Sequence, residues 1–197
     1  MSLDQPDVLA TITPIVDILA TLGVRYHIGG SLASSAYGIP RATADVDLVA
    51  ELRVDQIDAF VERLQSEYYV DPDRARESVL QQTSFNLIHL ETMLKVDIFV
   101  PEALAFAQQE MNRARQQPLD NAETARLFFL KSPEDLVLRK LIWYRTGGEI
   151  SERQWSDIIG VLKVQAERLD FEYLATWAAI LGLTDLLERV IADAKGL

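Results

Sequence analysis

Apolar residues recur at two different intervals along the first hundred positions. Some stretches repeat them three and four residues apart, the spacing of an amphipathic helix, and others are short and apolar or alternate apolar with polar residues, as strands do. In this half of the chain the pattern predicts helices at residues 7–22, 31–37, 55–66 and 72–81, and strands at 25–28, 45–50, 84–90 and 93–100. Only Glu91 and Thr92 separate the last two strands, so we expect a hairpin there.

The second half of the chain is predicted to be almost wholly helical. After a helix at 102–115 and an apolar run at 126–130, Ser132 and Pro133 begin a new series of helices. Serine caps a helix start and proline suits the first helical turn. The first helix is expected to start at Ser132 and Pro133 and to include residues 136–145, and the others are expected at 151–169, 171–181 and 184–195.

The change from a mixed to a helical pattern predicts two units. Residues 1–130 are expected to form an α/β domain, and residues 131–197 a helical bundle that closes one wall of its cleft. In the first helix of the bundle, Leu138 and Leu141 belong to the packing stripe, which places Lys140 on another face.

The composition of the chain excludes several kinds of functional site. The chain has 197 residues, of which 49% are hydrophobic, enough for a substantial core. It has no cysteine, which excludes disulfides, zinc–thiolate sites and cysteine nucleophiles. His27 and His89 lie in strand-like runs, where we expect them to be packed or hydrogen-bonded. Trp143, Trp155 and Trp177 are expected to pack between helices and not to form a base-stacking platform.

The charge of the chain bears on its partners. A net charge of −11 and a pI near 4.6 predict no extended nucleic-acid surface and favour a small substrate, although transfer to one end of an RNA stays compatible with them. The basic pairs Arg74 with Arg76 and Arg113 with Arg115 are expected on solvated helix faces. No apolar run reaches 18 residues and no signal peptide is evident, so we expect a cytoplasmic protein without a membrane partner.

Three aspartates are the candidate metal ligands. Asp45 and Asp47 alternate with apolar residues in a predicted strand, so both carboxylates point to one face. Asp97 lies in a later predicted strand. Like charges on one face repel unless a cation lies between them, and carboxylate oxygens suit Mg²⁺ or Mn²⁺. Lys95 shares the face of Asp97, where it either points at bound phosphate or balances the acids.

A glycine-rich turn precedes the acid pair. Gly29, Gly30 and Ser31 follow a predicted strand and open a predicted helix. Two glycines let the backbone approach a ligand closely, Ser31 can cap the helix, and a helix N-terminus attracts phosphate. Together with the acids, this turn predicts a site that handles a phosphorylated ligand and a metal.

The order of these features resembles the DNA polymerase β-like nucleotidyltransferase superfamily. Its signature is a Gly-Gly or Gly-Ser turn, a short spacer, an acid-x-acid pair and a third acid on a neighbouring strand. Residues 41–47 resemble the bacterial minimal nucleotidyltransferases. Residues 132–136, followed by Lys140 and Leu141, resemble the helix after the catalytic domain in the abortive-infection type of these proteins.

The resemblance implies a fold, a reaction and roles for individual residues. The fold is α/β (α+β), a mixed sheet flanked by helices and followed by a C-terminal helical bundle. The reaction is transfer of a nucleoside monophosphate from an NTP to an acceptor hydroxyl, on a small molecule, a protein or an RNA end. The implied metal ligands and catalytic residues are Asp45, Asp47 and Asp97, and the implied nucleotide-binding residues are Gly29, Gly30, Ser31, Arg41 and Lys140.

Several alternatives stay open at this point. Lys140 either reaches the phosphates or is an exposed helix lysine, and Arg41 either contacts phosphate or orders its loop. The chain is either a transferase or a nucleotide- and metal-binding module without transfer activity, such as half of a toxin–antitoxin pair. The third functional alternative is an acid-cluster phosphohydrolase, which the glycine turn disfavours because such sites do not need a helix terminus aimed at a triphosphate. As for assembly, either an antitoxin partner or a homodimer is expected.

Overall fold

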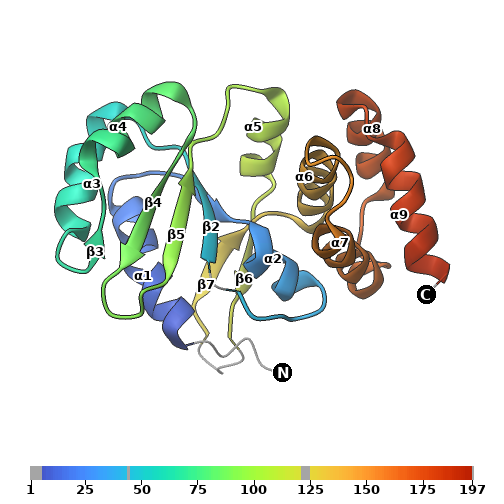
Figure 1. Ribbon diagram of the computed structural model, residues 1–197, viewed down its shortest axis with the longest axis horizontal. Coiled ribbons are helices and arrows are strands. Elements are labelled where there is room, and N and C mark those ends of the chain that lie inside the picture. The colour runs from blue at the N-terminus through green and yellow to red at the C-terminus, as the bar shows by residue number, and fades with distance from the viewer. Residues whose placement is uncertain (1–5, 44, 121–124, 197) are drawn as a thin grey trace.

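The computed structural model describes residues 6–43, 45–120 and 125–196. Its centre is a seven-stranded mixed sheet with the strand order β3-β4-β5-β2-β1-β7-β6 (Figure 1). The strands are β1 Tyr26–Ile28, β2 Asp45–Ala50, β3 Tyr68–Tyr69, β4 Ser84–His89, β5 Lys95–Phe99, β6 Arg115–Pro118 and β7 Leu127–Leu130. The helices are α1 Pro6–Thr21, α2 Gly30–Tyr37, α3 Ile57–Leu64, α4 Pro72–Gln81, α5 Ala105–Asn112, α6 Pro133–Thr146, α7 Glu152–Gln165, α8 Phe171–Leu181 and α9 Thr184–Gly196, with a 3₁₀ turn η1 at Val54–Gln56. None of the helices in these ranges is both long and apolar enough to cross a membrane.

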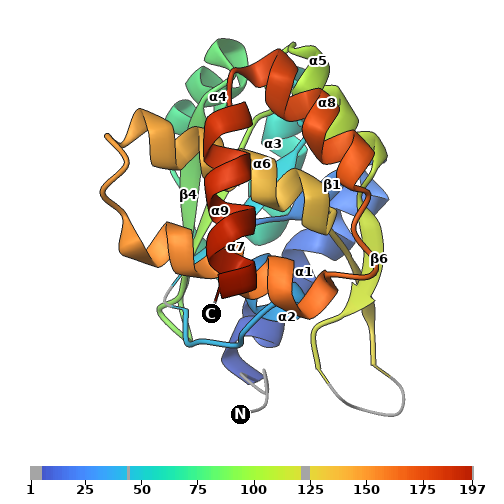
Figure 2. The same ribbon diagram turned by 90° about the vertical axis from the view of Figure 1, so that its right-hand side faces the viewer.

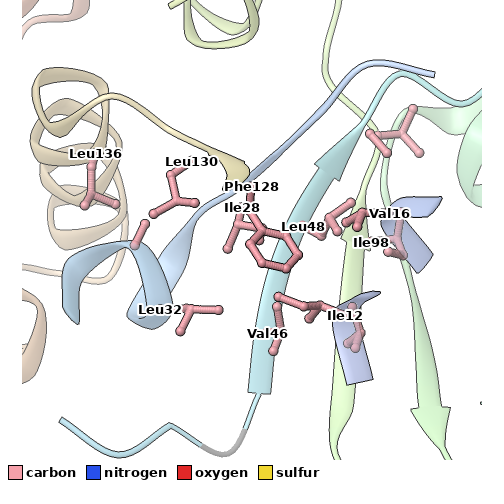
Figure 3. Close-up of a cluster of buried hydrophobic side chains, with 14 of the residues drawn as sticks. Ile12, Val16, Ile28, Leu32, Val46, Leu48, Ile98, Phe128, Leu130 and Leu136 are labelled. Atoms are coloured by element: carbon pink, nitrogen blue, oxygen red, sulfur yellow. The ribbon is translucent and has the colours of Figure 1, made fainter. Parts of the chain in front are cut away.

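The two faces of the middle strand β2 have different roles. One face packs into the core, and the other carries the candidate acids. It pairs antiparallel with β1 and parallel with β5. Val46 and Leu48 are buried, whereas Asp45 and Asp47 are half-buried, as the alternation in the sequence predicts. Figure 3 shows Val46 and Leu48 in the core beside Ile12 of α1. Burying these apolar side chains under α1 turns the acids to the opposite face.

The helices α6 to α9 form a layer at one end of the sheet (Figure 2). Buried ion pairs fasten this layer to the rest of the chain. Glu134, at the start of α6, is wholly buried and accepts hydrogen bonds from Arg113 at 3.1 Å and Arg115 at 3.0 Å. Arg113 is half-buried just after α5, and Arg115 is exposed but lies on the strand β6. The prediction of a solvated helix face is therefore wrong about the helix for both residues, and wrong about exposure for Arg113 alone. Asp135 accepts a hydrogen bond from Tyr173 of α8 at 2.6 Å.

The apolar run at 126–130 contains the strand β7, and two further strands lie where the sequence shows no such run. The first is β3, only two residues long, which pairs with β4. The second is β6, which pairs with β7 and begins at Arg115, the residue at which we expected a helix to end. That helix, α5, covers only Ala105–Asn112. Both strands lie at the sheet edges, and β6 is polar throughout, so neither shows an apolar alternation.

Candidate active site

Gly30 and Asp47 are in direct contact at the centre of the site. The backbone N–H of Gly29 donates to the carbonyl of Asp47 at 2.8 Å, which joins the turn to β2. Gly30 has a φ of +51°, and a Cβ atom added to it would overlap the Asp47 carboxylate. Glycine is therefore required at position 30, both for the backbone conformation and for the room that Asp47 takes. The helix α2 begins at Gly30, so the prediction that Ser31 caps it is wrong.

The three candidate acids lie on one face of two adjacent strands. Asp47 is the register partner of Asp97 across β2 and β5, and Asp45 is the partner of Lys95. Burial raises the pKa of Asp47, and the negative charges of Asp45 and Asp97 raise it further. The repulsion that the sequence predicts is therefore present at Asp47, and a cation between these oxygens would relieve it.

Lys95 supplies a positive charge at the edge of this acidic face. Its ammonium lies 2.7 Å from a carboxylate oxygen of Asp97, and this hydrogen bond raises the pKa of Lys95. In the described ranges no three His, Asp or Glu side chains converge closely enough to count as a ready-made metal cluster. The oxygen donors, their shared face and the raised pKa of Asp47 still fit a divalent cation held chiefly by the β2 pair.

A cluster of cations faces the acids from the other side of the site. Arg41 donates to both carboxylate oxygens of Asp157 in α7, at 2.9 and 3.0 Å, and to the Ser31 hydroxyl at 2.5 Å. Lys140 of α6 donates to the same carboxylate at 2.9 Å. Burial raises the pKa of Asp157, but the hydrogen bonds from Arg41 and Lys140 outweigh it and hold this pKa below its usual value. Two cations thus share one anion, which leaves net positive charge.

The alternative in which Lys140 is an exposed helix lysine is wrong. Only 4% of Lys140 is exposed, because α6 packs against α2, α7 and α8 and is covered on more than one face. Its ammonium is therefore held beside the acids, although burial of a charged group is unfavourable. The ion pair with Asp157, a residue that we did not single out from the sequence, offsets this cost.

Two cavities meet at Gly30, Asp47 and Trp143. The cavity on the side of the cations has a volume of about 300 Å³ and is also lined by Arg41 and Lys140. The cavity on the other side has a volume of about 330 Å³. We call the first the cationic cavity and the second the far cavity. The candidate acid Asp47 thus has access to two compartments.

The floor of the far cavity is a buried ion cluster. Glu110 accepts from Lys131 at 2.7 Å and from Arg139 at 2.9 and 2.5 Å. Burial raises the pKa of Glu110, but the two cations outweigh it and lower this pKa. His27 is wholly buried, as predicted for a packed strand residue, and its pKa is far below the usual value because of burial and of the charges on Lys131 and Arg139.

Trp143 is the one tryptophan whose predicted packing role is wrong. Trp155 and Trp177 pack against the core as predicted. Trp143 is 37% exposed, lines both cavities and lies against Phe99 of β5 with ring centroids 6.5 Å apart. Its position one turn after Lys140 on α6 is the signal in the sequence that would have placed it at the site.

Solved structures with the same architecture identify the fold. The chain matches the solution structure of the antibiotic-resistance factor ANT(2'')-Ia with a TM-score of 0.55 and 17% identity, over 92% of this chain and 95% of that chain. It matches an antigenic nucleotidyltransferase-like protein from Paracoccidioides brasiliensis with a TM-score of 0.56 and 17% identity, over 98% and 95%. A putative nucleotidyltransferase from Thermotoga maritima matches with a TM-score of 0.50 and 14% identity, over 78% and 94%.

These likenesses establish the fold and no more. No family model matches the chain, and no curated protein matches its sequence. The seven-stranded mixed sheet flanked by helices is thus a nucleotidyltransferase fold, which confirms the predicted fold class. The abortive-infection branch stays a prediction.

Proposed function

We propose that the chain is a metal-dependent nucleotidyltransferase that moves a nucleoside monophosphate from an NTP to an acceptor hydroxyl. The observation that carries this proposal is the contact between Gly30 and Asp47. It places one acid of the β2 pair, Asp47, directly against the start of a helix, where phosphate binds favourably. The cationic cavity adjoins this contact, so the site combines ligands for a metal with ligands for a triphosphate.

The acids have the metal-binding role in this proposal. Asp45 and Asp47 would hold Mg²⁺ or Mn²⁺, and Asp97 would complete the set. When bound, such a cation would stabilise the charge that develops on the transferred phosphate and on the attacking oxygen. Asp97 takes the proton of the acceptor hydroxyl, for which it must part from Lys95.

The turn and the cationic cavity bind the triphosphate. Gly29, Gly30 and Ser31 offer backbone amides and a hydroxyl, and Arg41 and Lys140 offer positive charge. The acceptor oxygen forms its bond to the α-phosphorus while the bond from that phosphorus to the bridging oxygen breaks. Pyrophosphate then leaves with the electron pair of the broken bond, close to the cations that neutralise it.

The far cavity receives the acceptor in this proposal. Its lining includes Asp47 but neither Arg41 nor Lys140, so a hydroxyl placed there can approach an α-phosphate whose triphosphate lies in the cationic cavity. Its volume of about 330 Å³ suits a small molecule, a size typical of such sites. A protein side chain and an RNA end are the other acceptors that an assay must include.

The two units that we propose are residues 1–130 and 131–197. The sheet ends with β7 at Leu130, and α6 begins at Pro133. Both cavities are lined from both units, by Gly30 and Asp47 on one side and by Trp143 on the other. Nucleotide binding would therefore depend on the contact between the units. An antitoxin partner and a homodimer stay predictions.

One observation favours a second candidate function. Asp97, which would accept the proton of the acceptor hydroxyl, is engaged in an ion pair with Lys95. A protein that only binds nucleotide and metal, without transfer, would have this arrangement permanently. No comparable observation favours a phosphohydrolase.

Transfer is tested by incubating the protein with each labelled NTP, Mg²⁺ and pooled acceptors. The pools contain hydroxylated small molecules, proteins and RNA. The expected result is pyrophosphate release together with a labelled acceptor in one pool, and neither product from the variant Asp45→Asn/Asp47→Asn. Nucleotide binding without product in any pool would favour the non-transferring module.

A further inference from the structure

An exposed aromatic ring lies beside the proposed phosphate ligands. Trp143 follows Lys140 by three residues on α6, which separates the two by about 4.5 Å along the helix axis. Neighbours at this spacing share a helix face. The indole ring lines the cationic cavity and has Phe99 behind it. A flat apolar surface is therefore available to a ligand whose phosphates are bound at Lys140.

A second residue of the same cavity has a side-chain oxygen without a hydrogen-bond partner among the described residues. Gln154, in the first turn of α7, lines the cationic cavity with Trp143. Its side-chain oxygen Oε1 is buried and accepts no hydrogen bond from the residues that the structure describes. Buried acceptors are almost always paired in folded proteins. The torsion that carries this amide is soft, so the group can turn to a ligand.

We propose that Trp143 and Gln154 form a nucleoside subsite, in which the base stacks on the indole ring and its edge is hydrogen-bonded by the Gln154 amide. This inference rests on the proposed function, because the phosphates must lie at Arg41 and Lys140. An amide that accepts and donates side by side matches adenine, which offers an amine and a ring nitrogen on one edge. Uracil offers an N3–H donor beside a carbonyl, and the same amide can pair with that edge as well. The subsite therefore takes both ATP and UTP.

Binding is measured by calorimetry with Mg²⁺ and three probes, ATP, UTP and inorganic tripolyphosphate. The inorganic probe reports on the phosphate ligands alone. Stacking of a base on an aromatic side chain is worth about 1–3 kcal/mol, so Trp143→Leu should weaken ATP about 5- to 150-fold. It should leave tripolyphosphate unchanged, and Trp143→Phe should recover most of the ATP affinity.

Gln154→Ala tests the contact with the base edge. It should weaken both ATP and UTP about tenfold and leave tripolyphosphate unchanged, since one good pair with a base edge is worth about 1–3 kcal/mol. Trp155→Leu is the matched control, because Trp155 lies next to Gln154 on α7 but lines a different cavity, away from the acids. All three probes should bind this control as they bind the wild type.

The outcomes separate this inference from the proposed function. Wild-type affinity for ATP in Trp143→Leu, or an equal loss of ATP and tripolyphosphate, would overturn the subsite and leave the proposed function standing. Wild-type affinity for both ATP and UTP in Gln154→Ala would overturn the contact between the amide and the base edge. A wild-type protein that binds neither ATP nor tripolyphosphate would overturn both proposals.

Discussion

The carboxylate of Asp47 occupies the place where a side chain at Gly30 would begin. The two residues come from different elements, α2 and β2, and the hydrogen bond from Gly29 to the Asp47 carbonyl holds them together. One acid of the pair is thereby fixed against the helix start that we propose for triphosphate binding. The phosphate and metal halves of the site form a single local structure.

Gly30→Ala should disrupt this structure. The new Cβ atom overlaps the Asp47 carboxylate, and a φ of +51° costs a non-glycine residue about 1–2 kcal/mol. We expect a melting temperature lower by at least about 2–8 °C, at 2–4 °C per kcal/mol, and no stabilisation by Mg²⁺ with an NTP. Gly29→Ala is the matched control, because its Cβ would meet only Lys131 at 3.7 Å. Equal melting curves for the two variants would contradict the role of this contact.

Removing the Lys140 ammonium should lower stability as well as phosphate binding. Asp157 keeps its bonds from Arg41 but loses a charged hydrogen bond, worth about 1.5–3 kcal/mol. Lys140→Ala should therefore melt roughly 3–12 °C lower than wild type and bind tripolyphosphate more weakly. Lys163→Ala, an exposed change on α7, is the control and should stay within about 0.5 kcal/mol. Unchanged tripolyphosphate affinity in Lys140→Ala would remove Lys140 from the phosphate site.

Lys95→Gln distinguishes the two roles that the sequence leaves open. If Lys95 balances the acids, its removal frees Asp97 and should tighten Mn²⁺ binding a few-fold, the modest effect expected of a half-exposed pair. Electron paramagnetic resonance of Mn²⁺ without nucleotide measures this directly. Weaker binding of tripolyphosphate with unchanged Mn²⁺ affinity would show instead that Lys95 contacts phosphate.

Glu134→Ala should loosen the helical layer. Removing the wholly buried carboxylate takes a partner from Arg113 and from Arg115, of which Arg113 keeps Asp135. Each lost charged hydrogen bond is worth about 1.5–3 kcal/mol. The free energy of unfolding in urea measures the loss. Glu188→Ala, an exposed change on α9, serves as the control. A loss below about 1 kcal/mol for Glu134→Ala would mean that this pair does not hold the layer in place.

Local patterns predict much of the fold. Three elements, β2, α4 and α8, begin and end at the residues that the sequence predicts, because each has a clear apolar repeat or a Pro or Asp at its start. The strand β6 has neither an apolar repeat nor a Pro or Asp at its start. It forms by pairing with β7. Edge strands of this kind depend on contacts that no short stretch of sequence contains.

The site is predictable where one element determines it. The alternation in β2 predicts that Asp45 and Asp47 share a face, which the structure confirms. The burial of Lys140 depends on how α6 packs against three other helices, and its partner Asp157 lies on one of them. A helical repeat shows which residues share a face, but not which faces other helices will cover. Trp143 was expected to be packed between helices, but its face of α6 borders the cavities and stays partly exposed.

The acid pair should reduce the stability of the ligand-free protein at neutral pH. The folded-state pKa of Asp47 is raised, so the folded protein binds more protons than the unfolded chain between the two pKa values. Stability therefore falls as pH rises through this window. Asp45→Asn/Asp47→Asn removes the effect and should melt at or slightly above the wild-type temperature at pH 7, but not at pH values below the window.

The most direct test of the central claim is a melting curve of wild type and of Asp45→Asn/Asp47→Asn, with and without Mg²⁺ and each NTP. Ligand at about a hundred times its dissociation constant stabilises wild type by roughly 2.7 kcal/mol. For a chain of this length that raises the melting temperature by about 5–10 °C. We predict this rise for wild type with at least one NTP and none for the double variant. Equal rises in both proteins would mean that the pair does not hold the metal, which contradicts the account.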